Sequence, residues 1–125
     1  MAGSARDGEV TILVFDLVGG PICVSTDDGQ IVYGKIAPLI REGHKVIASF
    51  EGVEILVPAF LSSAIGRLYG EFTDEQIREA LMVRDMPTGG MDTLEFVTEH
   101  AKAYFENQEA YRRALKEVME EEDWQ

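Results

Sequence analysis

The chain has 125 residues, the size of one ordinary domain, and its 46% apolar and 27% charged residues are typical of a globular protein rather than a disordered one. Acidic residues outnumber basic ones by 23 to 11, and the resulting net charge of −12 at pH 7 disfavours direct binding to nucleic acid or to anionic membrane surfaces. A single cysteine excludes a disulfide within the chain, and no apolar run is long enough to span a bilayer. Because the first ten residues lack the apolar segment of a signal peptide, we expect a cytoplasmic protein.

The N-terminal part is predicted to be extended. Residues 1–8 are polar and predict a loose tail. Residues 9–19 alternate in polarity and are rich in β-branched side chains, which predicts a strand that ends at the turn 19–21. Residues 22–25 predict a shorter extended piece that pairs with this strand as a hairpin.

A helix is predicted over residues 26–43. Asp27 and Asp28 stand at its N-terminal end, where acidic side chains are favourable, and Gly43 is a stop signal. Pro38 lies inside the pattern and predicts a kink or a change of register, because proline cannot donate the helical hydrogen bond. The apolar residues that define this helix recur at spacings of three and four: Ile31, Val32, Ile36, Leu39 and Ile40.

A strand and a second helix are predicted next. Residues 45–56 are strand-like, with a buried strand through Phe50 and a turn at 51–52. Pro58 suits the first position of a helix, where its missing N–H costs nothing, and the helix is predicted to reach Phe72.

The predicted helix 58–72 has two distinct faces. At 100° per residue, one half of the wheel carries the core-facing side chains: Phe60, Leu61, Ala64, Ile65, Leu68 and Phe72. Another arc carries the small residues: Ala59, Ser62, Ser63, Gly66 and Gly70. A glycine in a helix interior costs about 1 kcal/mol of helix stability. The small residues on this face therefore indicate that another backbone packs closely against it. That backbone is either the chain's own C-terminal helix or a partner protein or second copy.

The sequence around Ser62 and Ser63 does not match that of a catalytic nucleophile. A hydrolase nucleophile elbow requires G-x-S-x-G on a sharp turn between a strand and a helix. Here the first glycine is missing, both serines fall inside the helix, and no histidine and acid are recognisable as activators. Ordinary helix serines are the favoured interpretation.

A short helix, a strand and a loop follow. Thr73 and Gln76 have the spacing of a capping box, which predicts a helix that starts there and runs to about Ala80. Residues 81–86 predict a strand and residues 87–90 a loop.

The loop 87–90 is a candidate anion site. It lies between a predicted strand and a predicted helix, so the amides of Thr88, Gly89 and Gly90 could meet an anion. The loop lacks the lysine of a P-loop and the spacing of a dinucleotide fingerprint, and a flexible connector is the favoured alternative. Isolated histidines at 44 and 100 show no metal-binding spacing, so no metal or cofactor is expected.

The C-terminal part is predicted to be helical. Residues 92–105 open with Asp92 and Glu95 in capping-box spacing, and residues 107–123 either continue this helix or start a new one after a break near Asn107. The second segment is amphipathic, with small and apolar residues at helical spacing: Ala110, Tyr111, Ala114, Leu115, Val118 and Met119. This face docks onto the chain's own domain, or it forms a dimer or enters a partner's groove.

Several short motifs carry a resemblance to a known family. They are Val24-Ser25-Thr26 before the first helix, F-E-G-V at 50–53, A-F-L at 59–61 and A-I-G-R-L-Y at 64–69. Over residues 24–72 the chain resembles the bacterial and phage-associated STAS-like domain family of unknown function. The resemblance weakens over 73–106, where 81–85 suits the last strand of the family.

STAS-like domains are similar to anti-sigma-factor antagonists. The resemblance implies a mixed β-sheet packed with helices, no catalysis, and binding to a protein, typically a histidine-kinase-like ATPase that acts as serine kinase and anti-sigma factor. In those antagonists the serine of a D-S-S-G motif is the phosphorylation switch. Matching Ile65-Gly66-Arg67 to the antagonists' L-G-R places Val57, Pro58 and Ala59 at that motif, so no hydroxyl remains for the switch.

The sequence therefore predicts an α/β STAS-like domain over 9–106 with a helical C-terminal extension over 107–125. The leading function is a non-enzymatic interaction module in a bacterial regulatory system. The residues expected to line its docking surface are Glu51, Gly52, Pro58, Ala59, Ser62, Ser63, Gly66 and Arg67. The alternatives are a small-ligand or nucleotide sensor that uses the loop 87–90, and a structural homo-oligomer built on the C-terminal helix.

Overall fold

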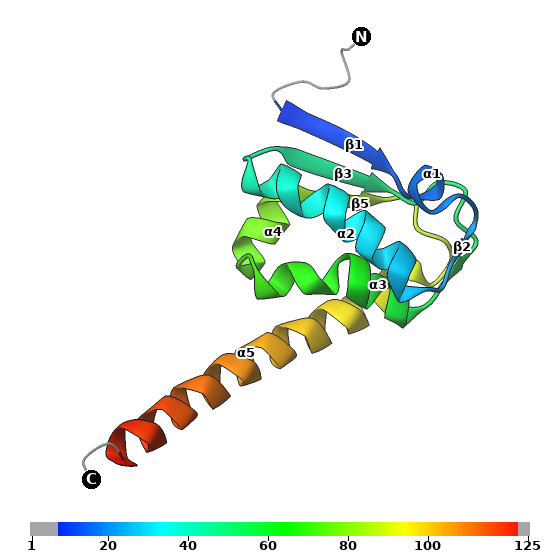
Figure 1. Cartoon of the computed structure of the whole chain (residues 1–125). Coiled ribbons are helices and arrows are strands. Elements are labelled where there is room, and N and C mark those ends of the chain that lie inside the picture. Colours follow the sequence, from blue (N-terminus) through cyan, green and yellow to red (C-terminus); the bar gives the residue numbers. More distant parts are fainter. Residues whose placement is uncertain (1–7, 123–125) are drawn as a thin grey trace.

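The main sheet has three parallel strands in the order β1-β3-β5: β1 (Glu9–Leu13), β3 (Lys45–Ser49) and β5 (Leu81–Arg84). The computed structural model describes the backbone of residues 8–122 and the side chains of residues 8–118. Helices α2 (Thr26–Arg41) and α3 (Pro58–Ala64) lie on one side of this sheet (Figure 1). On the other side Thr11, Leu13 and Met82 are exposed. The expected α/β class with parallel pairing is confirmed.

The N-terminal strand is shorter than predicted. Its ladder with β3 ends at the pair Leu13 and Ser49, and the chain then turns into the helix α1 (Val14–Val18). Beyond that pair the strand has no partner, whereas the helix buries Val14 completely. Gly19 ends α1 in the left-handed region, with φ 87°.

The predicted hairpin between residues 9–19 and 22–25 is wrong. Strand β2 (Ile22–Cys23) pairs in parallel with β4 (Ile55–Leu56), and the two form a separate two-stranded sheet. Pro21 prepares this pairing, because its carbonyl accepts the N–H of both Glu54 and Ile55. The partner therefore comes from a segment more than thirty residues away in sequence, which local patterns cannot reveal.

Helix α2 confirms the first predicted helix. The side chain of Ser25 caps it by accepting the N–H of Asp28 at 2.9 Å. The helix continues past Pro38 to Arg41 without a change of register, and Gly43 follows with φ 89°. Its core-facing side is fully or almost fully buried: Val32, Ile36, Ala37 and Ile40.

The predicted helix 58–72 is divided in two. Helix α3 ends at Ala64, and after Ile65 the chain continues as the 3₁₀ helix η2 (Gly66–Gly70). The predicted core face is nevertheless confirmed, with Phe60, Leu61, Ala64, Ile65 and Leu68 buried and Phe72 half-buried.

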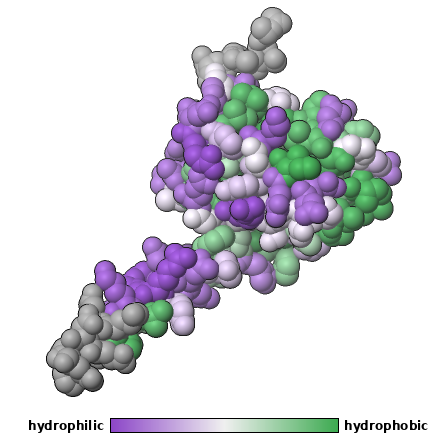
Figure 2. All heavy atoms as spheres, viewed as in Figure 1, coloured by the Kyte–Doolittle hydropathy of each residue, from purple (hydrophilic) through white to green (hydrophobic). Residues whose placement is uncertain are grey.

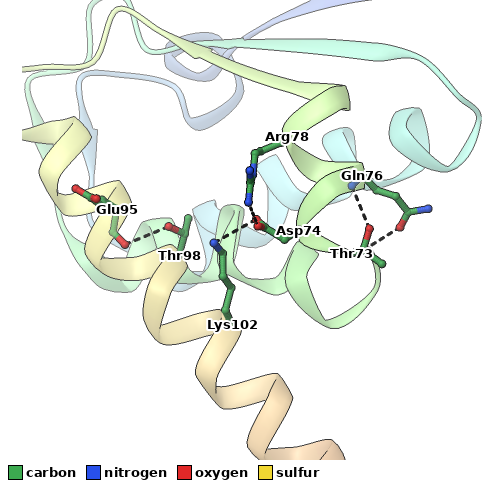
Figure 3. A network of polar contacts seen from close by, with 7 residues as sticks. All are labelled: Thr73, Asp74, Gln76, Arg78, Glu95, Thr98 and Lys102. Atoms are coloured by element: carbon green, nitrogen blue, oxygen red, sulfur yellow. Dashed lines mark hydrogen bonds and ion pairs between the residues drawn. The ribbon is translucent and has the colours of Figure 1, made fainter.

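The capping box at Thr73 is confirmed. Thr73 Oγ1 accepts the N–H of Gln76 at 3.0 Å, and Gln76 Oε1 accepts the N–H of Thr73 at 2.8 Å (Figure 3). Helix α4 (Asp74–Ala80) follows, and it leads directly into β5. In the first turn of α4, Asp74 forms ion pairs with Arg78 and with Lys102 of the last helix, so α4 is tied to α5 (Figure 3).

The C-terminal region is one helix, α5 (Gly90–Glu122). The helix starts before Asp92, so the predicted capping box of Asp92 and Glu95 is wrong. The backbone stays helical at Asn107, so the segment after it continues the same helix. Its first half packs on α3 and η2, and its second half projects away from the domain (Figure 1). Residues 1–7 of the predicted tail 1–8, and residues 123–125 of the predicted helical extension 107–125, lie outside the described residues.

In the described part of the chain, no helix combines the length and apolar character needed to cross a bilayer.

Candidate functional site

A groove between α3–η2 and α5 brings together five of the eight predicted docking residues. Its volume is about 590 Å³. From α3 and η2 it is lined by Pro58, Ala59, Ser62, Gly66 and Arg67. From α5 it is lined by Phe96, Val97, His100, Ala101, Tyr104 and Phe105.

Close packing of η2 on α5 is seen at Gly66, which lines the groove, and at Gly70, which lies beyond it. A Cβ added at Gly66 would lie 3.5 Å from the Cβ of Ala101 and 3.6 Å from Val97 Cγ1. A Cβ added at Gly70 would lie only 2.5 Å from the ring of Phe105. Gly66 and Gly70 of the small-residue face therefore pack against the chain's own C-terminal helix, which was the first of the two interpretations, whereas Ser63 contacts α2.

The α5 wall of the groove is aromatic and open to solvent. Phe96, His100 and Tyr104 are exposed and recur at a spacing of four, one helical turn apart. The rings of Phe96 and His100 stack with centroids 4.1 Å apart, and His100 Nδ1 donates to the carbonyl of Phe96 at 2.9 Å. We did not predict these wall residues, although their spacing in the sequence was a usable signal.

Arg67 is the charged residue at the rim, and a polar cluster holds it. Its guanidinium lies 4.3 Å from the centroid of the Tyr33 ring. The hydroxyl of Tyr33 donates to Glu71 Oε1 at 2.9 Å, and Arg41 forms an ion pair with the same carboxylate. Hydrogen bonding from Arg41 lowers the pKa of Glu71, and burial followed by the Glu71 contact raises the pKa of Tyr33. Within this cluster Arg67 contacts the ring of Tyr33, and it remains exposed beside the groove.

Ser63 has a structural place. It is buried, and its Oγ donates to the carbonyl of Thr26 at 2.8 Å, which ties α3 to the first turn of α2. Ser62 is exposed at the groove rim. The two adjacent serines therefore have different surroundings.

Glu51 and Gly52 lie apart from the groove, in the turn after β3. Gly52 has φ 86°, and a Cβ there would lie 2.9 Å from the ring of Phe15 in α1. Figure 2 shows apolar residues gathered over the end of the domain that carries α1 and β2. The exposed apolar side chains of these segments and of β4 are Phe15, Ile22, Val24 and Ile55. Glu51 and Gly52 thus border a second apolar surface.

The predicted anion loop has some of its groups already engaged. The N–H of Gly90 donates to the carbonyl of Pro87 at 2.8 Å, and Gly90 is buried. The carbonyl of Gly89 accepts the N–H of Thr93, while Thr88 is exposed. The loop is therefore a turn that starts α5.

The two histidines are also engaged locally. His44 Nδ1 lies 3.0 Å from the carbonyl of Gly8, and its Nε2 lies 3.6 Å from Glu42 Oε1. Among the residues that the structure describes, no three His, Cys, Asp or Glu side chains come together in a way that could hold a metal ion.

Comparison with known proteins gives one match. The model of a family described as a STAS-like domain of unknown function matches residues 28–87, from the first turn of α2 to the loop after β5. No curated protein and no solved structure matches the chain. The matched segment contains Pro58, Ala59, Ser62, Gly66 and Arg67, and α5 follows it. Residues 28–87 are thus similar to a STAS-like domain of unknown function.

Proposed function

We propose that this protein is a non-enzymatic interaction module of a bacterial regulatory system, and that its groove receives an amphipathic helix of a protein partner. The observation that carries the proposal is the groove itself, in which the five docking residues face the exposed aromatic wall of α5. Pro58, Ala59 and Ser62 leave room on one side, while Phe96 and Tyr104 offer apolar contact on the other.

The dimensions of the wall favour a helix as the occupant. From Phe96 to Tyr104 the wall is about 12 Å long, two turns of helix. An amphipathic helix presents its anchors at positions i, i+4 and i+7 over a similar length. Arg67 at the rim suits a carboxylate that flanks such anchors, because a guanidinium can donate two parallel hydrogen bonds.

The phosphoserine switch of the antagonists has no counterpart at the start of α3. Pro58 and Ala59 occupy the first helical positions, and neither can accept a phosphate. Binding at this groove is therefore independent of phosphorylation at that place. A histidine-kinase-like ATPase is the partner that the resemblance to anti-sigma-factor antagonists favours.

A photo-crosslinking experiment tests the groove. A benzophenone side chain placed at Ser62 is expected to capture a defined protein in the source cell. The matched control places it at Met82, which is exposed on the far face of the sheet. Equal products from both positions, or none from Ser62, would contradict the proposal.

Reconstitution with the captured protein provides the second step. Ala59→Arg fills the groove and is expected to weaken binding at least about tenfold, a change of about 1.4 kcal/mol. Met82→Arg serves as the control and leaves the affinity unchanged. An Ala59→Arg variant that binds as tightly as the unmodified protein would exclude the groove.

A further inference from the structure

Helix α5 carries one exposed stripe along most of its length. Six residues fall within an arc of about 100° on the helical wheel: Phe96, His100, Tyr104, Tyr111, Leu115 and Val118. The five of them that are large hydrophobic residues have between 45% and 68% of their surface exposed. The first three stripe residues line the groove, and the last three lie on the half of α5 that projects from the domain.

The stripe is symmetric about Asn107 to within half a residue. Phe96 and Val118 lie eleven positions before and after it. In an antiparallel pair of α5 helices with its two-fold axis at Asn107, Phe96 faces Val118 of the second copy. The pairs His100 with Leu115 and Tyr104 with Tyr111 are centred between Asn107 and Gln108, half a residue further along the helix. The same arrangement therefore brings these residues opposite each other to within about 1.5 Å along the helix axis.

We propose that two copies of this chain associate through antiparallel α5 helices, so that the projecting half of each helix fills the groove of the other copy. This inference rests on the proposed function, because it keeps the helix-in-groove contact and names α5 of a second copy, in place of a helix of an ATPase, as the occupant. In each copy the stripe residues 96–104 line the groove, and the stripe residues 111–118 lie on the projecting half of α5. In the dimer, the projecting half of each copy covers the groove of the other.

The exposed area agrees with a dimer. An aromatic side chain can bury about 150–250 Å², so the five half-exposed hydrophobic residues represent on the order of 500 Å² of apolar surface per copy. A standard interface buries about 800 Å² per partner, of which roughly 60% is apolar. The stripe therefore supplies the apolar share of one interface, and the same patch serves both copies as two-fold symmetry requires.

Charge disfavours a parallel arrangement of the two helices. The last three residues of α5, 120–122, are all glutamate, and a parallel pair would bring two such ends together. In the antiparallel pair they lie at opposite ends of a contact about 33 Å long, well beyond the Debye length of about 8 Å at physiological salt. Asn107 at the two-fold axis can pair with its copy through amide hydrogen bonds, and a central polar pair of this kind sets the register.

Sedimentation equilibrium on the full chain tests association. The unmodified protein is expected to be a dimer, and Leu115→Asp is expected to weaken the dimer at least about a hundredfold, since each dimer would bury two carboxylates. Lys116→Asp is the matched control: Lys116 is exposed on nearly the opposite side of α5, so this variant stays dimeric. An unmodified protein that remains a monomer up to about 0.1 mM, or a Leu115→Asp variant that remains a dimer, overturns the proposal.

Disulfide trapping tests the orientation. A disulfide requires Cα atoms within about 7 Å, so the double variant Phe96→Cys/Val118→Cys is expected to form a covalent dimer under oxidation, and neither single variant is. The native Cys23 is completely buried and does not interfere. A covalent dimer of Val118→Cys alone indicates a parallel pair and overturns the proposal, as does the failure of the double variant to form one.

The outcomes separate this inference from the proposed function. A monomeric protein whose Ser62 photoprobe captures a different protein retains the helix-in-groove function and loses only the second copy as its occupant. A monomeric protein whose Ser62 photoprobe captures nothing loses both.

Discussion

Gly29 sets how closely α2 and α3 approach each other. A Cβ at this position would lie 2.7 Å from both the carbonyl oxygen of Phe60 and the Cβ of Ser63. The Gly29→Ala variant is therefore expected to lose about 1–3 kcal/mol of unfolding free energy, because overpacking outweighs the better helix propensity of alanine. Urea unfolding followed by circular dichroism measures the difference.

Gly34 in the same helix is the matched control. A Cβ there meets no atom within 4 Å, so Gly34→Ala is expected to gain up to about 1 kcal/mol from helix propensity alone. Equal effects of the two substitutions would show that the approach of α2 and α3 is not limited by Gly29.

Glu71 gives the fold an acid-sensitive contact. The hydrogen bond from Arg41 lowers its pKa, so the carboxylate stabilises the folded state above the ordinary glutamate pKa of about 4.3. This contribution disappears as the pH falls through the lowered folded pKa. Glu71→Gln is therefore expected to reduce the unfolding free energy at pH 7, and the difference from the unmodified protein shrinks below about pH 4.

Urea midpoints between pH 7 and pH 3 test this dependence. Glu79→Gln serves as the control, because Glu79 is exposed on α4 and has no ion-pair partner within the part of the chain that the structure describes. A difference for Glu71→Gln that stays constant over the whole range would show that the ion pair with Arg41 does not contribute.

At the scale of elements, two glycines of η2 differ in how tightly α5 covers them. A Cβ at Gly66 makes ordinary contacts with Ala101 and Val97, whereas a Cβ at Gly70 overlaps the ring of Phe105. Gly66→Ala is expected to be nearly neutral, and Gly70→Ala to cost about 1–3 kcal/mol through overpacking and to displace Phe105. Amide hydrogen exchange in residues 101–105 reports the loosened contact, and unchanged protection in Gly70→Ala would contradict it.

Elements with strong local signals were predicted correctly from sequence. Neighbouring residues alone determine the apolar spacing of α2, the capping box of α4 and the short apolar strands β3 and β5. Apart from the capping box at Asp92, the wrong predictions concern features decided by distant contacts. Strand β1 ends where β3 offers no further partner, β2 pairs with β4, and helix 58–72 divides where α5 covers Gly66.

The candidate site was predicted in part for the same reason. Pro58, Ala59, Ser62, Gly66 and Arg67 lie along one segment, so a single helix pattern could group them. The opposite wall comes from residues 96–105, and only the packing of α5 brings it to α3. Ser63 is next to Ser62 in the sequence, but it lies on a different side of α3. Its hydroxyl therefore contacts α2 and does not line the groove.

At the scale of the whole molecule, the projecting half of α5 contributes little to the stability of a single copy. Every described side chain from Glu109 to Val118 is exposed. A chain that ends at Gln108 is therefore expected to keep its unfolding free energy within about 0.5 kcal/mol when measured at low concentration. Urea unfolding in the low micromolar range measures this, and a large loss there would mean that the segment docks onto its own domain.

Association adds a concentration dependence to the full chain. A dimer binds only folded copies, so the melting temperature of the full chain is expected to rise with protein concentration. The chain that ends at Gln108 lacks Tyr111, Leu115 and Val118, and its melting temperature is expected to stay constant. Calorimetry at two concentrations about a hundredfold apart separates the two cases.

The reactivity of Cys23 in β2 reports on the opening of the small sheet formed by β2 and β4. Cys23 is completely buried, and burial, followed by the charge of Asp28, raises the pKa of its thiol to about 11. Since the thiolate is the reactive form, the folded protein resists thiol reagents and is labelled only when this region opens. The labelling rate therefore measures how often the region around Cys23 opens. Labelling faster than global unfolding allows would show that the two-residue ladder of β2 and β4 separates while the three-stranded sheet stays closed.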